Sequence, residues 1–326
     1  MTIQEIAKMA GVSVSAVSRY LNNGYVSEEK SERIQKIIEE TGYTPLTHAR
    51  ILRTRKTKVI GVIVPKISSD SISRVVQGIS IELDKQGYQM LLVNTENKVD
   101  KEIVYLNLLE HNPVDGIIFV ATLMQKKHDK VLSKLEVPIV IVGQNYGNYT
   151  CIYHDDFHAA KEVTQRLINA GRKRLACIFV TEEDKAAGRN RLMGYKEALE
   201  EGGLAVNPTY IAQAEFTWES GYEQMKNLLE RCPDIDGVFC ATDTIAVGAV
   251  EYIKESEKST PENISVVGIG FSKISQVITP KLTTARLHYK TSGQESASML
   301  LDMINKEDVL SKKVMLSYEI IDGESV

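Results

Sequence analysis

Residues 2–21 read TIQEIAKMAGVSVSAVSRYL, the pattern of two short amphipathic helices joined by a tight turn. The apolar residues of the first helix recur at helical spacing: Ile3, Ile6, Ala7 and Ala10. Gly11 is expected to end this helix, because glycine readily takes the left-handed conformation of a C-cap. Ser13 is expected to be the N-cap of the second helix, whose inner face carries Val17, Tyr20 and Leu21.

A third helix completes a small all-α module. It is expected to begin at Ser27 and to run to Gly42, with acidic residues in its first turn that suit a capping box. Helix–turn–helix spacing would turn Val14, Ser15 and Arg19 outward, where a guanidinium can donate two hydrogen bonds to guanine in the major groove. At this point a purely structural three-helix bundle remains the alternative.

The charge of the chain is unevenly distributed. The net charge is −4 over 326 residues, but residues 1–58 contain 10 Lys and Arg against 6 Asp and Glu, whereas the rest contains 29 against 37. Five basic residues lie in a stretch that we interpret as a linker with a conditional helix: Arg50, Arg53, Arg55, Lys56 and Lys58. A basic module fused to an acidic body indicates a polyanionic partner for the module.

From residue 59 onward, short apolar runs alternate with amphipathic helical segments, beginning with VIGVIVP at 59–65. This alternation predicts parallel sheets with helices on both faces, and its length favours two packed subdomains with a ligand cleft between them. No apolar run is long enough to cross a bilayer and the first residues show no signal peptide, so a cytoplasmic protein is expected. The widely spaced Cys151, Cys177, Cys232 and Cys240 suit buried, reduced thiols.

The same N-terminal residues resemble the signature of the LacI family of bacterial transcriptional regulators. The match covers residues 2–7, 10–13 and 17–22, continues through 42–45, 49–52 and 60–65, and extends over essentially the whole chain. The resemblance implies a helix–turn–helix module plus an α/β periplasmic-binding-protein-like body of two doubly wound parallel-sheet subdomains. The implied limits are 1–45 for DNA binding, 46–58 for a hinge helix, and 59–326 for effector binding and dimerisation. Within the body, an N-subdomain is expected at about 59–156 and 287–309, and a C-subdomain at about 157–286 and 310–326.

The resemblance also implies which residues bind operator DNA: Thr2, Ser13, Val14, Ser15, Ser18, Arg19, Asn22, Tyr43, Ala49, Leu52 and Arg53. In the family the hinge forms a helix when two subunits sit on the operator, and Leu52 matches the leucine that wedges into the minor groove. A core position in an ordinary helix is the alternative for Leu52. One departure is Leu46, at a position where the family commonly has an asparagine.

Eight residues are expected to line the effector pocket: Gln144, Asp155, Arg191, Phe216, Trp218, Thr242, Asp243 and Tyr289. The resemblance implies six of them, whereas Thr242 and Asp243 follow a predicted strand at the carboxyl edge of the sheet, where ligands usually bind. The Arg191 fork suits two vicinal hydroxyls or a phosphate, although a lone helix arginine is more often a surface salt-bridge partner. Asp243 has helix capping as its alternative role. Phe216 and Trp218 would form an aromatic surface for sugar C–H groups, with core packing as the alternative.

Gly270 departs from the family, because many relatives carry a sugar-binding aspartate at this position. The missing carboxylate leaves room and removes negative charge, and both effects are compatible with a disaccharide or a phosphorylated sugar.

The sequence therefore predicts a homodimeric repressor of a carbohydrate-utilisation operon, with operator DNA and a sugar or sugar-phosphate effector as partners and sucrose as the first choice. A transcriptional activator, or a global catabolite regulator with a protein or non-sugar effector, is the alternative. An enzyme is disfavoured because the nucleotide-loop, zincin and nucleophile-elbow motifs are missing, although His154 and His158 have the spacing of two metal ligands. No cofactor, metal or membrane partner is expected, and a solute-binding transport component does not explain the basic module.

Overall fold

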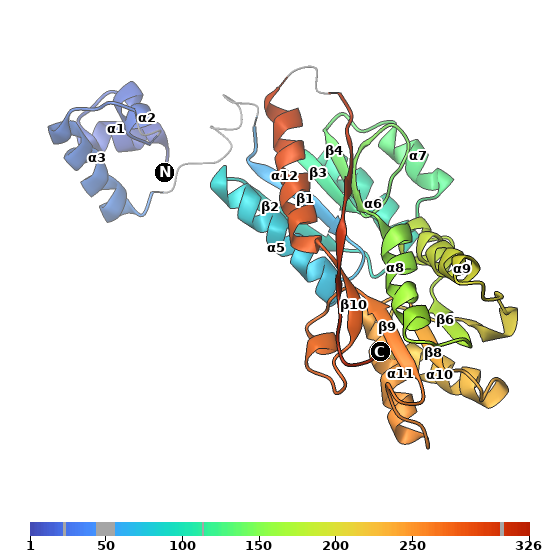
Figure 1. Ribbon diagram of the computed structural model, residues 1–326. Helices are drawn as coiled ribbons and strands as arrows, with labels where there is room; N and C mark the ends of the chain where they lie inside the picture. Colours follow the sequence, from blue (N-terminus) through green and yellow to red (C-terminus); the bar gives the residue numbers. More distant parts are fainter. Residues whose placement is uncertain (22–23, 44–55, 113, 307–309) are drawn as a thin grey trace. The chain divides into compact units, whose positions relative to one another are not determined.

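The computed structural model describes residues 1–326 except 22–23, 44–55, 113 and 307–309 (Figure 1). Its contacts divide the chain into two compact units, residues 1–57 and 58–326. Among the described residues, no helix combines the length and the apolar character that a membrane span needs.

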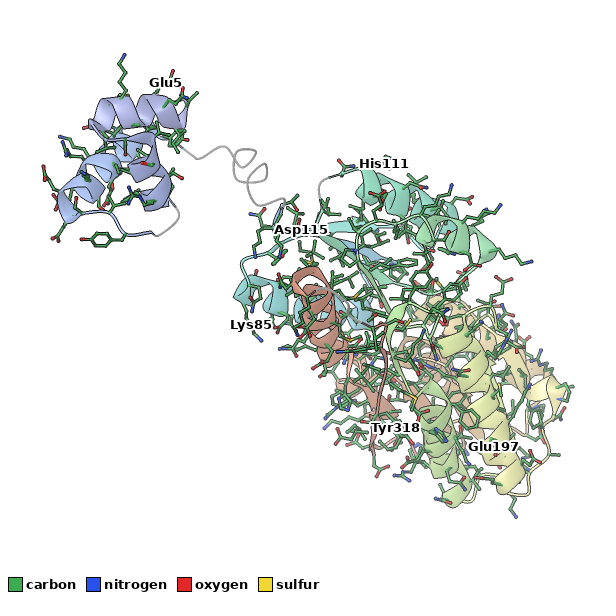
Figure 2. The ribbon with its side chains drawn as sticks, turned by 90° about the horizontal axis from the view of Figure 1, so that it is seen from above. Glu5, Lys85, His111, Asp115, Glu197 and Tyr318 are labelled. Carbon is green, nitrogen blue, oxygen red and sulfur yellow. The ribbon has the colours of Figure 1, made fainter. Side chains whose placement is uncertain are left out.

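The first unit contains α1 (Ile3–Ala10), α2 (Val14–Leu21) and α3 (Glu28–Thr41). Its helices enclose one small core, made of Ile6, Ala7, Ala10, Val17, Ile34 and Tyr43. Thr2 and Glu5 form a reciprocal capping box at the start of α1, and Figure 2 labels Glu5 on this helix. Gly11 ends α1 in the left-handed conformation, and the Ser13 hydroxyl accepts from the Ala16 amide at 3.2 Å, both as predicted. The expected capping box at Ser27 is wrong, because its side chain makes no capping hydrogen bond.

The second unit has two six-stranded sheets. The first sheet is entirely parallel, in the order β11-β5-β4-β3-β1-β2. Its strands are β1 (Val59–Val64), β2 (Gln89–Asn94), β3 (Gly116–Val120), β4 (Ile139–Val142), β5 (Thr150–His154) and β11 (Lys313–Leu316). The helices of this first subdomain are α5 (Asp70–Lys85), α6 (Val99–His111), α7 (Lys126–Leu132) and α12 (Tyr289–Asn305). The apolar run predicted from residue 59 is strand β1, which lies between β3 and the edge strand β2 and is buried on both faces.

The second sheet has the order β12-β10-β9-β8-β6-β7 and is parallel except for β12, which pairs antiparallel with β10. Its strands are β6 (Leu175–Phe179), β7 (Ile211–Gln213), β8 (Gly237–Cys240), β9 (Ser265–Ile269), β10 (Thr283–Leu287) and β12 (Tyr318–Ile321). The main helices of this second subdomain are α8 (Asp156–Asn169), α9 (Arg191–Glu201), α10 (Trp218–Arg231) and α11 (Asp243–Glu255). Short helical turns are η1 (Lys185–Asn190), η2 (Pro208–Tyr210) and η3 (Ile274–Gln276).

The described chain passes between the subdomains three times: after β5, after β10, and between β11 and β12. The expected assignment of residues 310–326 to the C-subdomain is therefore wrong in part. Residues 313–316 form β11, which pairs with β5 in the first sheet, so the last crossing lies at Ser317. Tyr318 then begins the return to the second subdomain, where its hydroxyl donates to Glu162 of α8 (Figure 2).

Three helix pairs pack backbone against backbone through glycines. A Cβ on Gly293 of α12 would lie 2.0 Å from the Val75 carbonyl oxygen of α5, and the two helices run side by side in Figure 1. Gly248 of α11 has the same relation to Trp218 of α10 at 1.9 Å, and Gly194 of α9 to α8 at 2.2 Å. These close contacts fix the first turns of helices that begin between the two subdomains.

Candidate functional site

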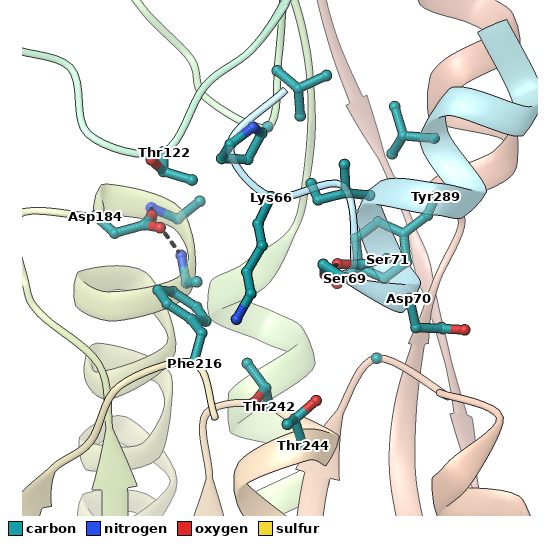
Figure 3. Close-up of a pocket in the computed structure, with 18 of the residues that line it drawn as sticks. Lys66, Ser69, Asp70, Ser71, Thr122, Asp184, Phe216, Thr242, Thr244 and Tyr289 are labelled. Carbon is teal, nitrogen blue, oxygen red and sulfur yellow. Dashed lines mark hydrogen bonds between the residues drawn. The ribbon is translucent and has the colours of Figure 1, made fainter. Parts of the chain in front are cut away.

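The two subdomains enclose a cavity of about 570 Å³, which we call the cleft cavity (Figure 3). Its walls are the carboxyl ends of strands and the first turns of the helices that follow them, the usual ligand position in parallel α/β sheets. The volume lies within the ~300–1,000 Å³ of small-molecule sites. Predicted effector residues that line it are Gln144, Arg191, Phe216, Trp218, Thr242, Asp243 and Tyr289.

Arg191 lies at the floor of the cavity in a buried ion pair. Its Nη2 and Nε lie 2.7 and 2.8 Å from one carboxylate oxygen of Asp156, and its Nη1 donates to the Ala241 carbonyl. Burial by itself lowers the pKa of Arg191, but the Asp156 charge raises it, and the net direction is upward. A surface salt bridge, the alternative for Arg191, is wrong, because both partners are buried. Most nitrogens of the Arg191 guanidinium thus donate to groups of the protein itself.

Asp243 is the first residue of α11, but it does not cap that helix. The cap is Thr242, whose hydroxyl accepts from the Ile245 amide at 3.3 Å. The Asp243 carboxylate turns toward β9 and β10, where it accepts from the Ser272 amide at 2.7 Å and from the Thr284 hydroxyl at 2.5 Å. Burial raises the pKa of Asp243, and these donors partly offset that effect.

Gln144 makes a hydrogen bond across the cleft. It follows β4 of the first subdomain, and its amide Nε2 donates to Asp184 of the second subdomain at 2.9 Å. Asp184 also accepts from the Ala186 and Ala187 amides, so it caps η1. Burial raises the pKa of Asp184. This bond joins the two subdomains on either side of the cleft.

A second link across the cleft comes from Arg74 of α5. Its Nη2 donates to the Gly270 carbonyl at 2.7 Å and lies 2.9 Å from Asp70, while its guanidinium stacks 4.9 Å from the Tyr289 ring centre. Gly270 has φ +142°, a backbone conformation open to glycine. The position where relatives were expected to carry an aspartate thus presents a carbonyl to an arginine.

The predicted aromatic residues differ in exposure. Phe216 is partly buried, packs against the core of the second subdomain and also lines the cavity, so its contact with a sugar stays a prediction. Trp218, the first residue of α10, is 50% exposed at the cavity wall and is not a core residue. Tyr289 lies edge-on to the ring of His154 at 5.1 Å between centroids.

Asp155 does not line the cavity, contrary to the prediction of a ligand acceptor. Its carboxylate caps α8 by accepting from the His158 amide at 3.2 Å, and it lies 2.8 Å from Nδ1 of the same residue. The next residue, Asp156, lines the cavity instead. In the part of the chain that the structure describes, no group of three or more His, Cys, Asp or Glu side chains is arranged to hold a metal.

Several residues of the cavity were missed by the sequence analysis: Lys66, Ser69, Ser71, Arg74, Thr122, His154, Asp156 and Asp184. Burial lowers the pKa of His154 to about 4, so its imidazole is neutral at pH 7. Lys66 and Ser69 follow directly on the carboxyl end of β1, just as Thr122 follows that of β3. That placement was the signal available for them.

The expected DNA-reading face is the outer side of α2. Val14, Ser15 and Arg19 are exposed there, and Arg19 Nε donates to the Ser15 carbonyl at 3.3 Å. Ser18 is half-buried. Tyr43 is only 8% exposed and belongs to the core of the module, so its ring is not part of an open surface. Asn22, Ala49, Leu52 and Arg53 lie outside the described residues.

Comparison with known proteins agrees with this architecture. Residues 2–45 match the family described as bacterial regulatory proteins, lacI family, and residues 57–320 match the periplasmic binding proteins and sugar binding domain of LacI family. The sucrose operon repressor of Staphylococcus xylosus is 32% identical, with 97% of this chain and 98% of that protein covered. Catabolite control protein A of Priestia megaterium is 31% identical, with 98% and 97% covered.

Among solved structures, the complex of the transcriptional regulator CelR with cellobiose is similar over 100% of both chains, with 27% identity and a TM-score of 0.78. The similarity thus covers both the N-terminal module and the α/β body. The chain belongs to the LacI family of bacterial regulatory proteins.

Proposed function

We propose that the protein represses a carbohydrate-utilisation operon and that a sugar or sugar phosphate in the cleft cavity controls its affinity for operator DNA. The observation that carries this proposal is the cavity itself. It lies between two subdomains whose contacts across it, Gln144 to Asp184 and Arg74 to Gly270, depend on how far the cleft is closed. A ligand that prefers one degree of closure shifts the population of that state.

DNA binding would be the work of the module. Arg19 on α2 offers a bidentate donor for guanine, and the exposed methyl groups of Val14 suit a thymine methyl. The implied hinge at 46–58, with Leu52 as a minor-groove wedge, would connect the module to the body. Sugar binding and operator binding then influence each other by the same factor, because coupling between two sites is reciprocal.

A homodimer joined through the first subdomains would place two such modules on a near-palindromic operator. An exposed apolar surface supports this arrangement. Val104 and Leu108 are one helical turn apart on α6 and are 61% and 48% exposed, and Leu91 of the edge strand β2 is also exposed.

The relatives supply the effector class of the proposal. One is named a sucrose operon repressor and another is solved with cellobiose, so we propose a sucrose-like disaccharide, either free or phosphorylated, as the effector. Their names, an operon repressor and a transcriptional regulator, support a non-enzymatic role for this chain. We place its action in the cytoplasm, at the nucleoid.

The test begins with thermal unfolding of the full chain in the presence of mono-, di- and phosphorylated sugars. A ligand at about 100 times its Kd adds roughly 2.7 kcal/mol of stability. The stabilising sugar is then added to an operator-binding assay with DNA selected from random sequence by the protein. Release of DNA supports an inducer-controlled repressor, whereas tightening supports a corepressor. If no sugar in the panel changes either stability or DNA affinity, the proposed effector control is wrong.

The DNA contact has its own variants. Arg19→Ala is expected to weaken specific binding and to relax the preference at one base pair, with a cost of about 1–3 kcal/mol. Lys254→Ala, which removes the same charge from the surface of α11, is the control. Equal losses in the two variants would show that Arg19 contributes no base reading.

A further inference from the structure

Lys66 is a cation of the cleft cavity without an acidic partner. It follows β1 and Pro65, and Figure 3 shows its side chain extending into the cavity between Phe216 on one side and Ser69 on the other. Among the residues that the structure describes, no hydrogen bond or ion pair to its ammonium is found. The two other cations of the wall are already engaged: Arg74 by Asp70 and Arg191 by Asp156.

The acidic residues of the cavity wall do not compensate Lys66. Each of them stands at the N-terminal end of a helical segment, where its charge complements the helix dipole: Asp70, Asp156, Asp184, Glu219 and Asp243. Four of these carboxylates are also held by donors or cations of the protein, and the fifth, Glu219, is exposed. The wall thus contains four acids with protein partners, one exposed acid, and a lysine without an acidic partner.

Donor groups at the start of α5 also line the cavity. The hydroxyls of Ser68, Ser69 and Ser71 line it at the start of the 16-residue helix α5, and the Ser69 side chain makes no capping bond. The Ser69 and Ser71 hydroxyls lie 2.9 Å apart. An ammonium, several hydroxyls and the first amides of a helix together favour a multiply charged oxyanion.

Two deeply buried polar atoms in the wall favour a polar molecule in the cavity. The Ser292 side chain is fully buried and His154 is only 7% exposed, and both line the cavity. Within the described part of the chain, Ser292 Oγ and His154 Nε2 have no hydrogen-bond partner. Because an unsatisfied buried polar atom is costly, these atoms favour a polar partner in the cavity, either a ligand or water.

We propose that the effector is a phosphorylated sugar, with its phosphate bound by Lys66 and by the serine hydroxyls at the start of α5. The sugar rings would then lie toward Phe216 and Trp218, where the wall is aromatic. The assignment rests on the proposed function insofar as the cleft cavity is taken as the effector site. Beyond the proposed function, the inference states that the effector is negatively charged and that Lys66 recognises this charge.

The test compares matched ligand pairs by isothermal titration calorimetry of the full chain. Sucrose and trehalose are titrated against sucrose 6-phosphate and trehalose 6-phosphate. The phosphate is expected to improve Kd on the order of 10- to 100-fold for at least one pair, the size of one or two charge-assisted hydrogen bonds. Lys66→Met is expected to abolish that ratio while leaving Kd for the neutral sugar within about threefold, and Lys66→Arg to retain part of it. Lys85→Met, at the far end of α5, is the control for charge removal.

The outcomes separate this inference from the proposed function. If a neutral sugar binds as well as its phosphate and changes operator affinity, the phosphate site is wrong and the effector-controlled regulator stands. If the phosphate is preferred equally by wild type and Lys66→Met, the role of Lys66 is overturned. If every phosphorylated sugar fails to bind, the inference fails, and the operator assay with neutral sugars decides the proposed function separately.

Discussion

Removing the charge of Asp156 tests whether its buried ion pair with Arg191 stabilises the fold. Asp156 and Arg191 are 3% and 5% exposed, and two nitrogens of the guanidinium contact one carboxylate oxygen at 2.7 and 2.8 Å. Asp156→Asn leaves Arg191 buried without a charged partner, while its Nη1 still donates to the Ala241 carbonyl. Breaking such a pair lowers the free energy of unfolding by about 3–5 kcal/mol. This is a large share of the roughly 5–15 kcal/mol by which a folded protein is more stable than its unfolded chain.

Urea unfolding at pH 7, followed by circular dichroism and by the fluorescence of the single tryptophan, measures this loss. Arg166→Met is the matched control, because it removes an exposed pair with Asp322 at 2.9 Å and should cost less than about 1 kcal/mol. The double variant Asp156→Asn with Arg191→Gln should lose less than the sum of the two single variants, since neither partner then leaves a charge unpaired. A loss under about 1 kcal/mol for Asp156→Asn, or strict additivity, would refute the reasoning.

Three further predictions concern pH, packing and capping. Burial lowers the pKa of His154 to about 4, so unfolding takes up a proton below pH 6.5. Between pH 6.5 and 4, the free energy of unfolding of wild type, measured by urea titration, should fall by roughly 3 kcal/mol more than that of His154→Leu. Parallel pH profiles of the two proteins would contradict this. Gly248→Ala places a methyl carbon against the Trp218 carbonyl, so the free energy of unfolding should fall by about 1–3 kcal/mol. An unchanged midpoint of urea unfolding would rule out the close contact. Thr242→Ala removes the N-cap of α11 and should lower the free energy of unfolding by about 1 kcal/mol. The control Thr244→Ala, at an exposed position, should lower it by less than about 0.5 kcal/mol. Equal losses in the two variants would argue against capping.

Much of the fold was predictable because it depends on local patterns. Gly11 and Ser13 mark the ends of α1 and α2 through backbone conformations and hydrogen bonds that involve neighbouring residues only. The apolar run from Val59 identified β1 in the same way. The error at residues 313–316 has the opposite cause: a short edge strand pairs with whichever sheet is adjacent in space, and that choice depends on β5, about 160 residues earlier.

The cavity was predictable where a residue follows a strand at the carboxyl edge of a sheet, as Thr242 and Asp243 do after β8. Position after a strand does not decide which of two adjacent residues lines the cavity: Asp155 was predicted to do so, but Asp156 does. One residue of helical advance rotates a side chain by about 100°, which decides between a cap and a cavity wall. The link from Gln144 to Asp184 needed the cleft itself, because its two partners belong to different subdomains.

The three crossings between the subdomains also determine when this protein can finish folding during its synthesis. The outer edge of β5 receives its partner, β11, only after residues 313–316 leave the ribosome. At a translation rate of ~5–20 residues per second, that edge waits roughly 8–30 s with unpaired backbone groups. Exposed strand edges are sites of aggregation, so the nascent chain has a long interval in which a chaperone would help. Expression yield should therefore depend strongly on the few residues that close both sheets.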